Sequence, residues 1–198
     1  MKRNDSKYDN YVKHPRYGSH PLFTDENPQD DFANGVNLHW HTRKDCLIPN
    51  TAILADSNRQ VDAMFPITHY FDVKRRCDDC DRMFIFFARE QKYWYESLQF
   101  SINADCVRCV ECRKQKQFAA NKRAQYELLL KSEDRSDVDT LVLVDCCLSL
   151  IQASEFGRRS LETARRMLNS IPETSAVRKH ATYRDLRAKS ERLLASVE

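Results

Sequence analysis

The sequence predicts an α+β protein, in which a small cysteine-rich module with short strands and one helix precedes an antiparallel helical bundle. Two Cys-x-x-Cys pairs frame an aromatic-rich stretch between residues 77 and 112, and this stretch contains strand-like apolar runs. From residue 113 to the end, the apolar residues recur at helical spacing. These two patterns place the strands in the first part of the chain and most of the helices in the second.

Length and composition limit the possible classes of protein. The 198 residues suffice for one domain of ordinary size or two small ones. No apolar run approaches the roughly 20 residues that cross a bilayer, so we expect no membrane segment. The net charge is +3, which is too small to imply nucleic acid. The charge is uneven, however, because residues 113–198 carry 17 basic and 12 acidic groups.

Five of the eight cysteines lie between residues 77 and 112. Cys77 and Cys80 form one Cys-x-x-Cys pair, and Cys109 and Cys112 form a second. Cys106 and Cys109 have the same spacing and are an alternative second pair. Such a turn brings two thiolates to about 4 Å, which is the edge of a sulfur tetrahedron around Zn²⁺. The spacing therefore predicts one structural zinc ion held by four cysteines.

The choice between Cys106 and Cys112 depends on charge. Arg113 and Lys114 follow Cys112 at once and would offset the negative charge of four thiolates on one dication. The sequence therefore favours Cys112, with Cys106 as the alternative ligand. A disulfide framework is typical of small secreted chains, but the charged N-terminus has no apolar run of a signal peptide behind it. We expect a cytoplasmic protein with reduced cysteines.

The same stretch resembles the bacterial probable zinc-ribbon family, whose members are mostly uncharacterised. The resemblance rests on the cysteine pairs and on three runs: His69–Val73, Phe84–Ala88 and Glu90–Glu96. It is specific from about Ile48 to Gln117 and implies a zinc-binding module without an established activity. Relatives commonly have proline where this chain has Val110, in a motif that favours Cys109 and Cys112 as ligands. Many have glycine in place of Asp81, which predicts a strained or differently shaped first turn.

The first part of the chain has the pattern of an extended, partly ordered arm. Prolines and glycines between residues 15 and 35 break any long helix. Val36–His41 alternates like a short strand, with Trp40 on one face and two histidines on the other. We therefore divide the chain into this arm (1–47), a zinc-ribbon-like domain (48–117) and a helical bundle domain (118–198).

Within the cysteine-rich module, Met83–Ala88 is the clearest strand. Its residues are apolar on both faces, so both faces should be covered. Arg89–Leu98 then changes to helical spacing. We assign the aromatic cluster in this helix (Tyr93, Trp94 and Tyr95) to the module's small core rather than to stacking on nucleic-acid bases.

The spacing after residue 113 predicts four antiparallel helices with short connections. Val138–Glu155 is apolar almost all round and is expected to be the buried centre, with Cys146 and Cys147 as inert thiols. Ser136 and Asp139 resemble a capping box before it. The remaining predicted helices are Lys114–Lys131, Leu161–Ile171 and a last one from Thr174 or Ser175 towards Val197.

Nine basic residues form a candidate binding surface. Some lie beside the cysteines and others on the third predicted helix: Arg113, Lys114, Lys116, Lys122, Arg123, Arg158, Arg159, Arg165 and Arg166. A charge run is usually a solvated helix face. The alternative is a surface that contacts phosphates, whose binding would fall steeply with salt.

The sequence contains no recognisable catalytic motif. Three glycines nearly forbid a nucleotide-binding loop, and neither a nucleophile elbow nor a His-Glu-x-x-His helix is present. Zinc held by four cysteines has no open position for water. We therefore expect a non-enzymatic scaffold or adaptor that binds a protein partner or nucleic acid. The alternative is a metalloenzyme that uses His39 and His41, or a thiol-based redox sensor that uses Cys46 or Cys106.

Overall fold

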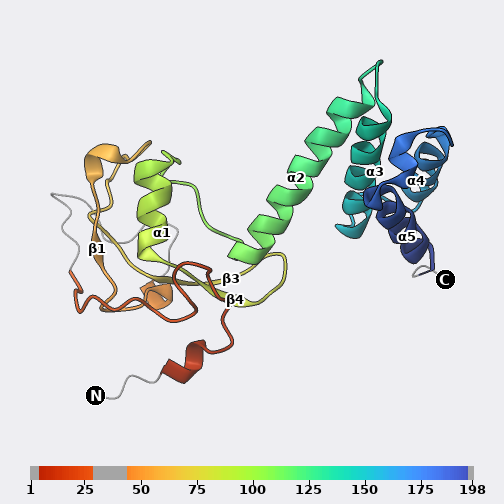
Figure 1. Cartoon of the computed structure of the whole chain (residues 1–198). Helices are drawn as coiled ribbons and strands as arrows, with labels where there is room; N and C mark the ends of the chain where they lie inside the picture. Colours follow the sequence, from red (N-terminus) through yellow and green to blue (C-terminus); the bar gives the residue numbers. More distant parts are fainter. Residues whose placement is uncertain (1–4, 29–43, 196–198) are drawn as a thin grey trace. The chain divides into compact units, whose positions relative to one another are not determined.

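The computed structural model of the chain describes residues 5–28 and 44–195 (Figure 1). They belong to two compact units, Met1–Arg113 (unit 1) and Lys114–Glu198 (unit 2). Short antiparallel strands lie in unit 1 and most of the helix in unit 2, which confirms the predicted α+β class. The finer division at residues 47 and 117 stays an interpretation, and the predicted strand at Val36–His41 lies outside the described residues.

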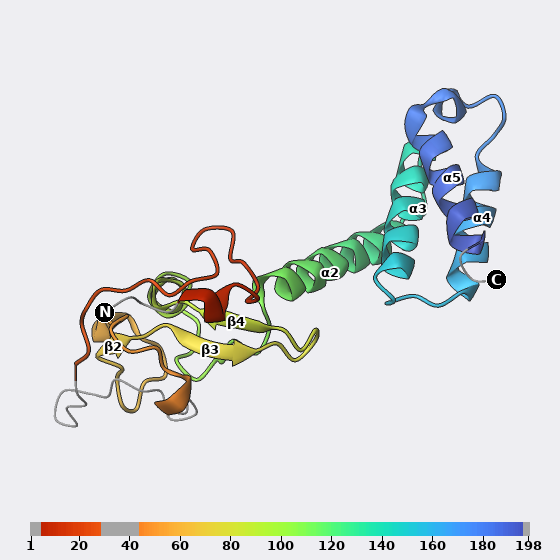
Figure 2. The ribbon, with the colours of Figure 1, turned by 90° about the horizontal axis from the view of Figure 1, so that it is seen from below.

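Two small antiparallel sheets of two strands each form the β part of unit 1; Figure 2 shows β3 and β4 side by side. β1 (Ile53–Leu54) pairs with β2 (His69–Tyr70), and β3 (Val73–Arg76) pairs with β4 (Met83–Phe86). The clearest predicted strand is β4, and both of its faces are buried. Phe84 and Phe86 pack with the cysteines, whereas Ile85 packs against the N-terminal arm.

The described part of the arm, residues 5–28, packs against the rest of unit 1. Tyr8 is 3% exposed and packs with Ile85 and Phe87. The backbone N–H of Val12 donates to the carbonyl of Met83 at 2.8 Å, which attaches the arm to β4. Over these residues the arm is therefore part of the fold.

A buried carboxylate, Asp72, joins three segments of unit 1. Its two oxygens accept the backbone N–H groups of Leu22, at 2.8 Å, and of Ala88, at 2.7 Å. Ala88 begins α1 (Ala88–Lys92), and the residue before it, Phe87, has no side chain that can cap the helix. Asp72 supplies this cap from outside the helix. Burial raises the pKa of Asp72 to about 6, against the opposing effect of the two N–H donors.

The predicted helix Arg89–Leu98 is present in a different form. α1 ends at Lys92 and continues as a π-helical turn, Tyr93–Ser97. The turn buries Tyr95, leaves Trp94 half-buried and leaves Tyr93 48% exposed. The prediction is confirmed for Tyr95 and Trp94, which belong to the core, and wrong for Tyr93, whose side chain the turn leaves on the surface.

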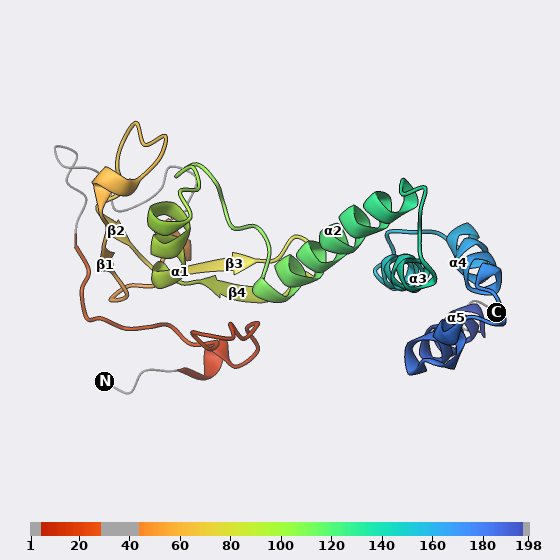
Figure 3. The same ribbon diagram turned by 45° about the horizontal axis from the view of Figure 1, so that its top comes forward.

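Four α-helices follow, and Figure 3 shows their order along the chain. They are α2 (Val110–Leu130), α3 (Asp137–Gln152), α4 (Arg159–Ser170) and α5 (Ala181–Ala195). The capping box of Ser136 and Asp139 is confirmed, and α3 supplies much of the buried core of unit 2. That core comes mainly from α3, α4 and α5; α2 adds the half-buried Tyr126, so it packs less deeply than the predicted bundle implies. In the described ranges no helix has the length and apolar character needed to span a bilayer.

Replacing Asp72 by Asn should destabilise the protein by about 2 kcal/mol at neutral pH, because the amide nitrogen would face one of the two N–H donors. The folded-state pKa is raised above the ordinary value, so Asp72 favours folding at low pH and this contribution is lost as pH rises towards 6. The unfolding free energy of the wild type minus that of Asp72→Asn should therefore fall by about 1 kcal/mol between pH 5 and 7. Urea titrations of both chains at several pH values measure it. Both chains carry the same thiols, which cancel in the difference; a flat or rising difference would contradict the prediction.

Candidate metal centre

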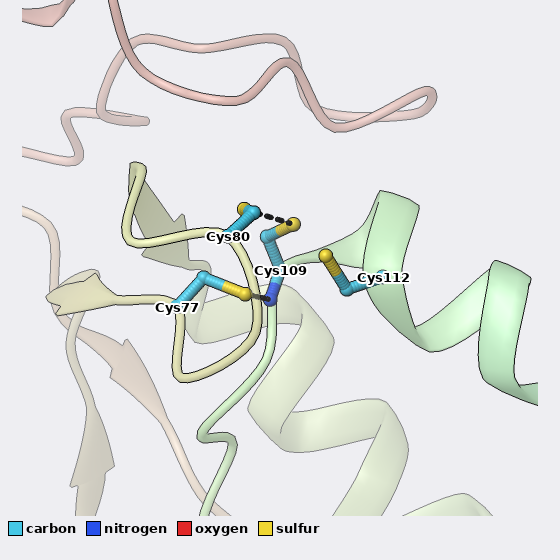
Figure 4. A group of neighbouring side chains, drawn as sticks. All are labelled: Cys77, Cys80, Cys109 and Cys112. Carbon is cyan, nitrogen blue, oxygen red and sulfur yellow. Dashed lines mark hydrogen bonds between the residues drawn. The ribbon is translucent and has the colours of Figure 1, made fainter. Parts of the chain in front are cut away.

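Two separate segments bring four cysteines together in unit 1 (Figure 4). Cys77 and Cys80 lie in the turn between β3 and β4. Cys109 lies immediately before α2, and Cys112 lies in its first turn. The four sulfur atoms all lie within 4.8 Å of one another, and the Sγ atoms of Cys80 and Cys109 are 3.9 Å apart.

This arrangement fits a zinc ion. A Zn–S bond of about 2.3 Å gives a tetrahedral edge of about 3.8 Å, which the 3.9 Å between Cys80 and Cys109 matches. Cys77, Cys109 and Cys112 are buried and Cys80 is half-buried, so the protein shields the site from most solvent. Four sulfur donors are typical of a structural zinc ion, and they fill its coordination sphere.

Cys106 is not a member of the four-sulfur group. Its thiol donates to the carbonyl of Arg108 at 3.4 Å, and burial raises the pKa of this thiol to about 12. A thiol with this pKa is unreactive near neutral pH, so the structure does not favour a sensor at Cys106. Cys46 is half-buried beside the cysteine cluster, and the histidines at 39 and 41 lie outside the described residues.

Backbone N–H groups support the thiolate form of Cys77. The N–H of Cys109 donates to the sulfur of Cys77 at 3.3 Å (Figure 4). Burial alone would raise the pKa of Cys77, but N–H groups of Cys109, Cys80 and Asp79 outweigh it and lower that pKa to about 6. Because metal binding requires deprotonated sulfur, these N–H groups favour the metal-ready state at Cys77, whereas burial and the neighbouring thiols raise the pKa of Cys112.

A cation beside Cys80 is Arg82, which the sequence analysis did not single out. Its guanidinium pairs with Glu111, and this pair, followed by the nearby Cys80, raises the pKa of Arg82. The only sequence signal was its place two residues after Cys80. A positive charge beside Cys80 offsets part of the negative charge of four thiolates.

Arg113 was expected to offset the negative charge of the thiolates, and it contacts other side chains of unit 1. It donates to Glu90 Oε1 at 2.7 Å and lies over the ring of Trp94, 4.9 Å from its centroid. His14 Nε2 of the arm is 3.6 Å from the same carboxylate oxygen. Arg113 therefore fastens the first turn of α2 to α1 and the arm, and its neighbour Lys114 is exposed.

Most of the other candidate basic residues also have identified contacts. Three pair with carboxylates: Lys122 with Asp145 at 2.6 Å, Arg123 with Glu155 at 2.7 Å and Arg165 with Glu162 at 3.2 Å. Lys116, Arg158, Arg159 and Arg166 are exposed, and Arg166 donates to the hydroxyl of Thr163 at 3.3 Å. Lys122, Arg123, Arg165 and Arg166 therefore contact other side chains of unit 2, and the candidate binding surface stays a prediction.

Asp81 confirms the strained turn predicted from the missing glycine. Its φ is 58°, in the left-handed region that glycine adopts without penalty. Its N–H donates to the carbonyl of Cys77 at 2.9 Å and so closes the first cysteine turn. Arg76 binds both the carboxylate and the carbonyl of Asp81, at 2.9 and 3.1 Å. Aspartate tolerates this conformation better than most residues.

Replacing Asp81 by Val should destabilise unit 1 by about 1 to 2 kcal/mol, because a β-branched residue is disfavoured at positive φ. Asp81→Gly should be nearly neutral, since it loses the exposed pair with Arg76 but relieves the strain. Asp78→Val, an exposed neighbour with ordinary φ, is the matched control. Thermal unfolding of the zinc-loaded chains measures all three, and equal losses for the two valine variants would refute the argument.

Comparison with known proteins agrees with this geometry. Residues 71–121 match the family model described as a probable treble clef domain, which covers β3, β4, the π-helical turn and both cysteine pairs. No curated protein and no solved structure matches the chain. The match over residues 71–121 and the four-sulfur group together support a zinc-binding module similar to a treble clef domain, with one structural zinc ion.

Proposed function

We propose that this protein is a non-enzymatic adaptor, in which the zinc-stabilised unit 1 presents a surface for a protein partner. The observation that carries the proposal is the closed four-sulfur group, which leaves a bound zinc ion no position for water or substrate. An ion of this kind holds a small domain together. A domain so stabilised, with no further catalytic motif in its sequence, is suited to recognition.

Charge supports a protein partner over nucleic acid at unit 1. Residues 77–112 carry 4 basic and 7 acidic groups. Arg113, the basic residue that directly follows Cys112, forms an ion pair with Glu90. A phosphate-binding surface needs several cations that are not already neutralised. Five arginines of unit 1 around the cysteine turns are each paired with a carboxylate: Arg75, Arg76, Arg82, Arg108 and Arg113.

We assign the zinc ligands as Cys77, Cys80, Cys109 and Cys112. Cys112→Ser should weaken zinc binding by more than about 100-fold, because it removes one of four sulfur donors. Cys106→Ser should retain one zinc ion per chain, since serine can donate to the carbonyl of Arg108 as the thiol does. Native mass spectrometry and competition with a chromophoric chelator measure both variants. Full zinc in Cys112→Ser with loss in Cys106→Ser would overturn the assignment.

A second candidate function is nucleic-acid binding by unit 2. Residues 158–195 carry 10 basic and 4 acidic groups, and Arg158, Arg159 and Arg166 on or beside α4 are exposed. This is the part of the described chain with the largest local excess of positive charge that could meet a phosphate backbone.

Binding of fluorescent single-stranded and duplex oligonucleotides separates the two functions. For a protein adaptor we expect only non-specific affinity at physiological salt, with Kd of about 10⁻⁶ to 10⁻⁴ M. Nanomolar binding that falls steeply with salt would instead establish the second candidate. In that case, replacing Arg158, Arg159 and Arg166 by Ala should weaken it, and Lys131→Ala, at an exposed lysine outside the nine candidate residues, is the control. Anisotropy titrations at several salt concentrations give both answers.

A further inference from the structure

A side-chain amide closes the loop between β1 and β2. Gln60 Nε2 donates to the carbonyl of Ile67 at 2.7 Å, and the N–H of Ile67 donates to Gln60 Oε1 at 2.9 Å. The amide therefore pairs with the backbone as a neighbouring strand would. Gln60 Nε2 also lies 3.2 Å from the hydroxyl of the buried Tyr70. Residues 60–67 form a closed loop, and Figure 3 shows this yellow-orange segment standing away from β1 and β2.

Both ends of this loop are anchored in unit 1. The carbonyl of Val61 accepts the N–H of Ile102 at 3.0 Å. At the other end, Ile67 is 4% exposed and packs with Tyr70 and Tyr95. Asp62, just inside the loop, has a φ of 59°, a conformation that costs free energy in a non-glycine residue. The path of the loop is thus fixed by contacts at its base.

Two large apolar side chains lie at the tip between these anchors. Met64 is 87% exposed and Phe65 is 67% exposed. Single exposed apolar residues are ordinary on protein surfaces, but two adjacent ones on a loop held at both ends form a compact projection. Aromatic side chains are frequent anchors of protein interfaces, and methionine adapts to irregular pockets. A loop with a fixed base loses little conformational entropy when it binds.

We propose that the loop of residues 60–67 is a docking element, which inserts Met64 and Phe65 into an apolar pocket on another protein. This inference rests on the proposed adaptor function and names the surface that unit 1 uses for it. The partner pocket is apolar, large enough for a phenyl ring and a thioether, and rimmed by basic groups.

The charge of this segment favours a protein partner over a membrane or nucleic acid. Between residues 53 and 68 the chain has two acidic residues, Asp56 and Asp62, and one basic residue, Arg59. Anionic lipid surfaces and nucleic acids are recognised by clusters of Lys and Arg, which this segment lacks. A protein pocket with a basic rim complements the two carboxylates.

Site-specific crosslinking in cells tests the loop. A benzophenone side chain introduced in place of Phe65 should form a discrete adduct with another protein, while the same group in place of Leu128, 73% exposed on α2, should not. The captured protein is then purified, and its Kd is measured for the wild type, Met64→Ser, Phe65→Ser and Leu128→Ser. Loss of either tip residue should weaken binding about 30-fold. Leu128→Ser should leave the Kd unchanged, and all variants should retain one zinc ion.

Four outcomes would overturn the inference. Two concern the crosslink: no adduct forms at position 65, or the adduct joins two copies of this chain. Two concern binding: the Kd of the captured protein is unchanged by both tip substitutions, or the chain binds phosphatidylcholine or phosphatidylserine vesicles through Phe65. The proposed function fails separately. A protein captured at position 65 whose Kd ignores both tip substitutions would reject the loop and keep the adaptor, whereas the absence of any adduct together with nanomolar oligonucleotide binding would reject both.

Discussion

The fold of unit 1 depends on the four-sulfur group that joins the β3–β4 turn to the start of α2. Each sheet has only two strands, and such a sheet is at best marginally stable alone. Cys80 and Cys109 lie 29 residues apart, so their shared zinc ion closes a long loop of chain. Structural zinc ions supply on the order of 10 kcal/mol of apparent folding free energy, which is comparable to the whole stability of a typical domain. The ion pair of Arg108 with Asp79 also joins the two cysteine turns and fixes their orientation more than their stability.

Buried polar contacts provide the second constraint on unit 1. Its apolar core is divided among several small clusters, so hydrophobic burial alone does not fix how the segments meet. Asp72 holds the arm and α1 through backbone N–H groups, and Glu90 holds Arg113 of α2 near His14 of the arm. Directional hydrogen bonds of this kind specify one arrangement where apolar contacts would allow several. The same rule applies to Gln60, which fixes the loop between β1 and β2.

Features that depend on neighbouring residues could be predicted from the sequence. Contacts between segments far apart in the chain could not. The capping box at Ser136 and the buried α3 depend on residues within one helix, and the strain at Asp81 followed from the absence of glycine. The role of Asp72 had no such signal, because Leu22 and Ala88 are 50 and 16 residues away. Arg82 of the hairpin pairs with Glu111 in the first turn of α2 and lies beside Cys80, because a hairpin turn and a helix start converge there. Spacing along one segment cannot reveal that convergence.

The placement of the cysteines gives each unit its own chemical reporter. Cys146 and Cys147 are fully buried in α3, and burial raises the pKa of both thiols, so they react only when unit 2 opens. Cys106 is likewise buried in unit 1, and its thiol is not one of the four sulfurs of the metal site. The modification rate of each thiol is therefore the population of an open state multiplied by an intrinsic rate. Alkylation of the natural thiols, followed by mass spectrometry, would record the order in which the two units unfold, and no engineered probe is needed.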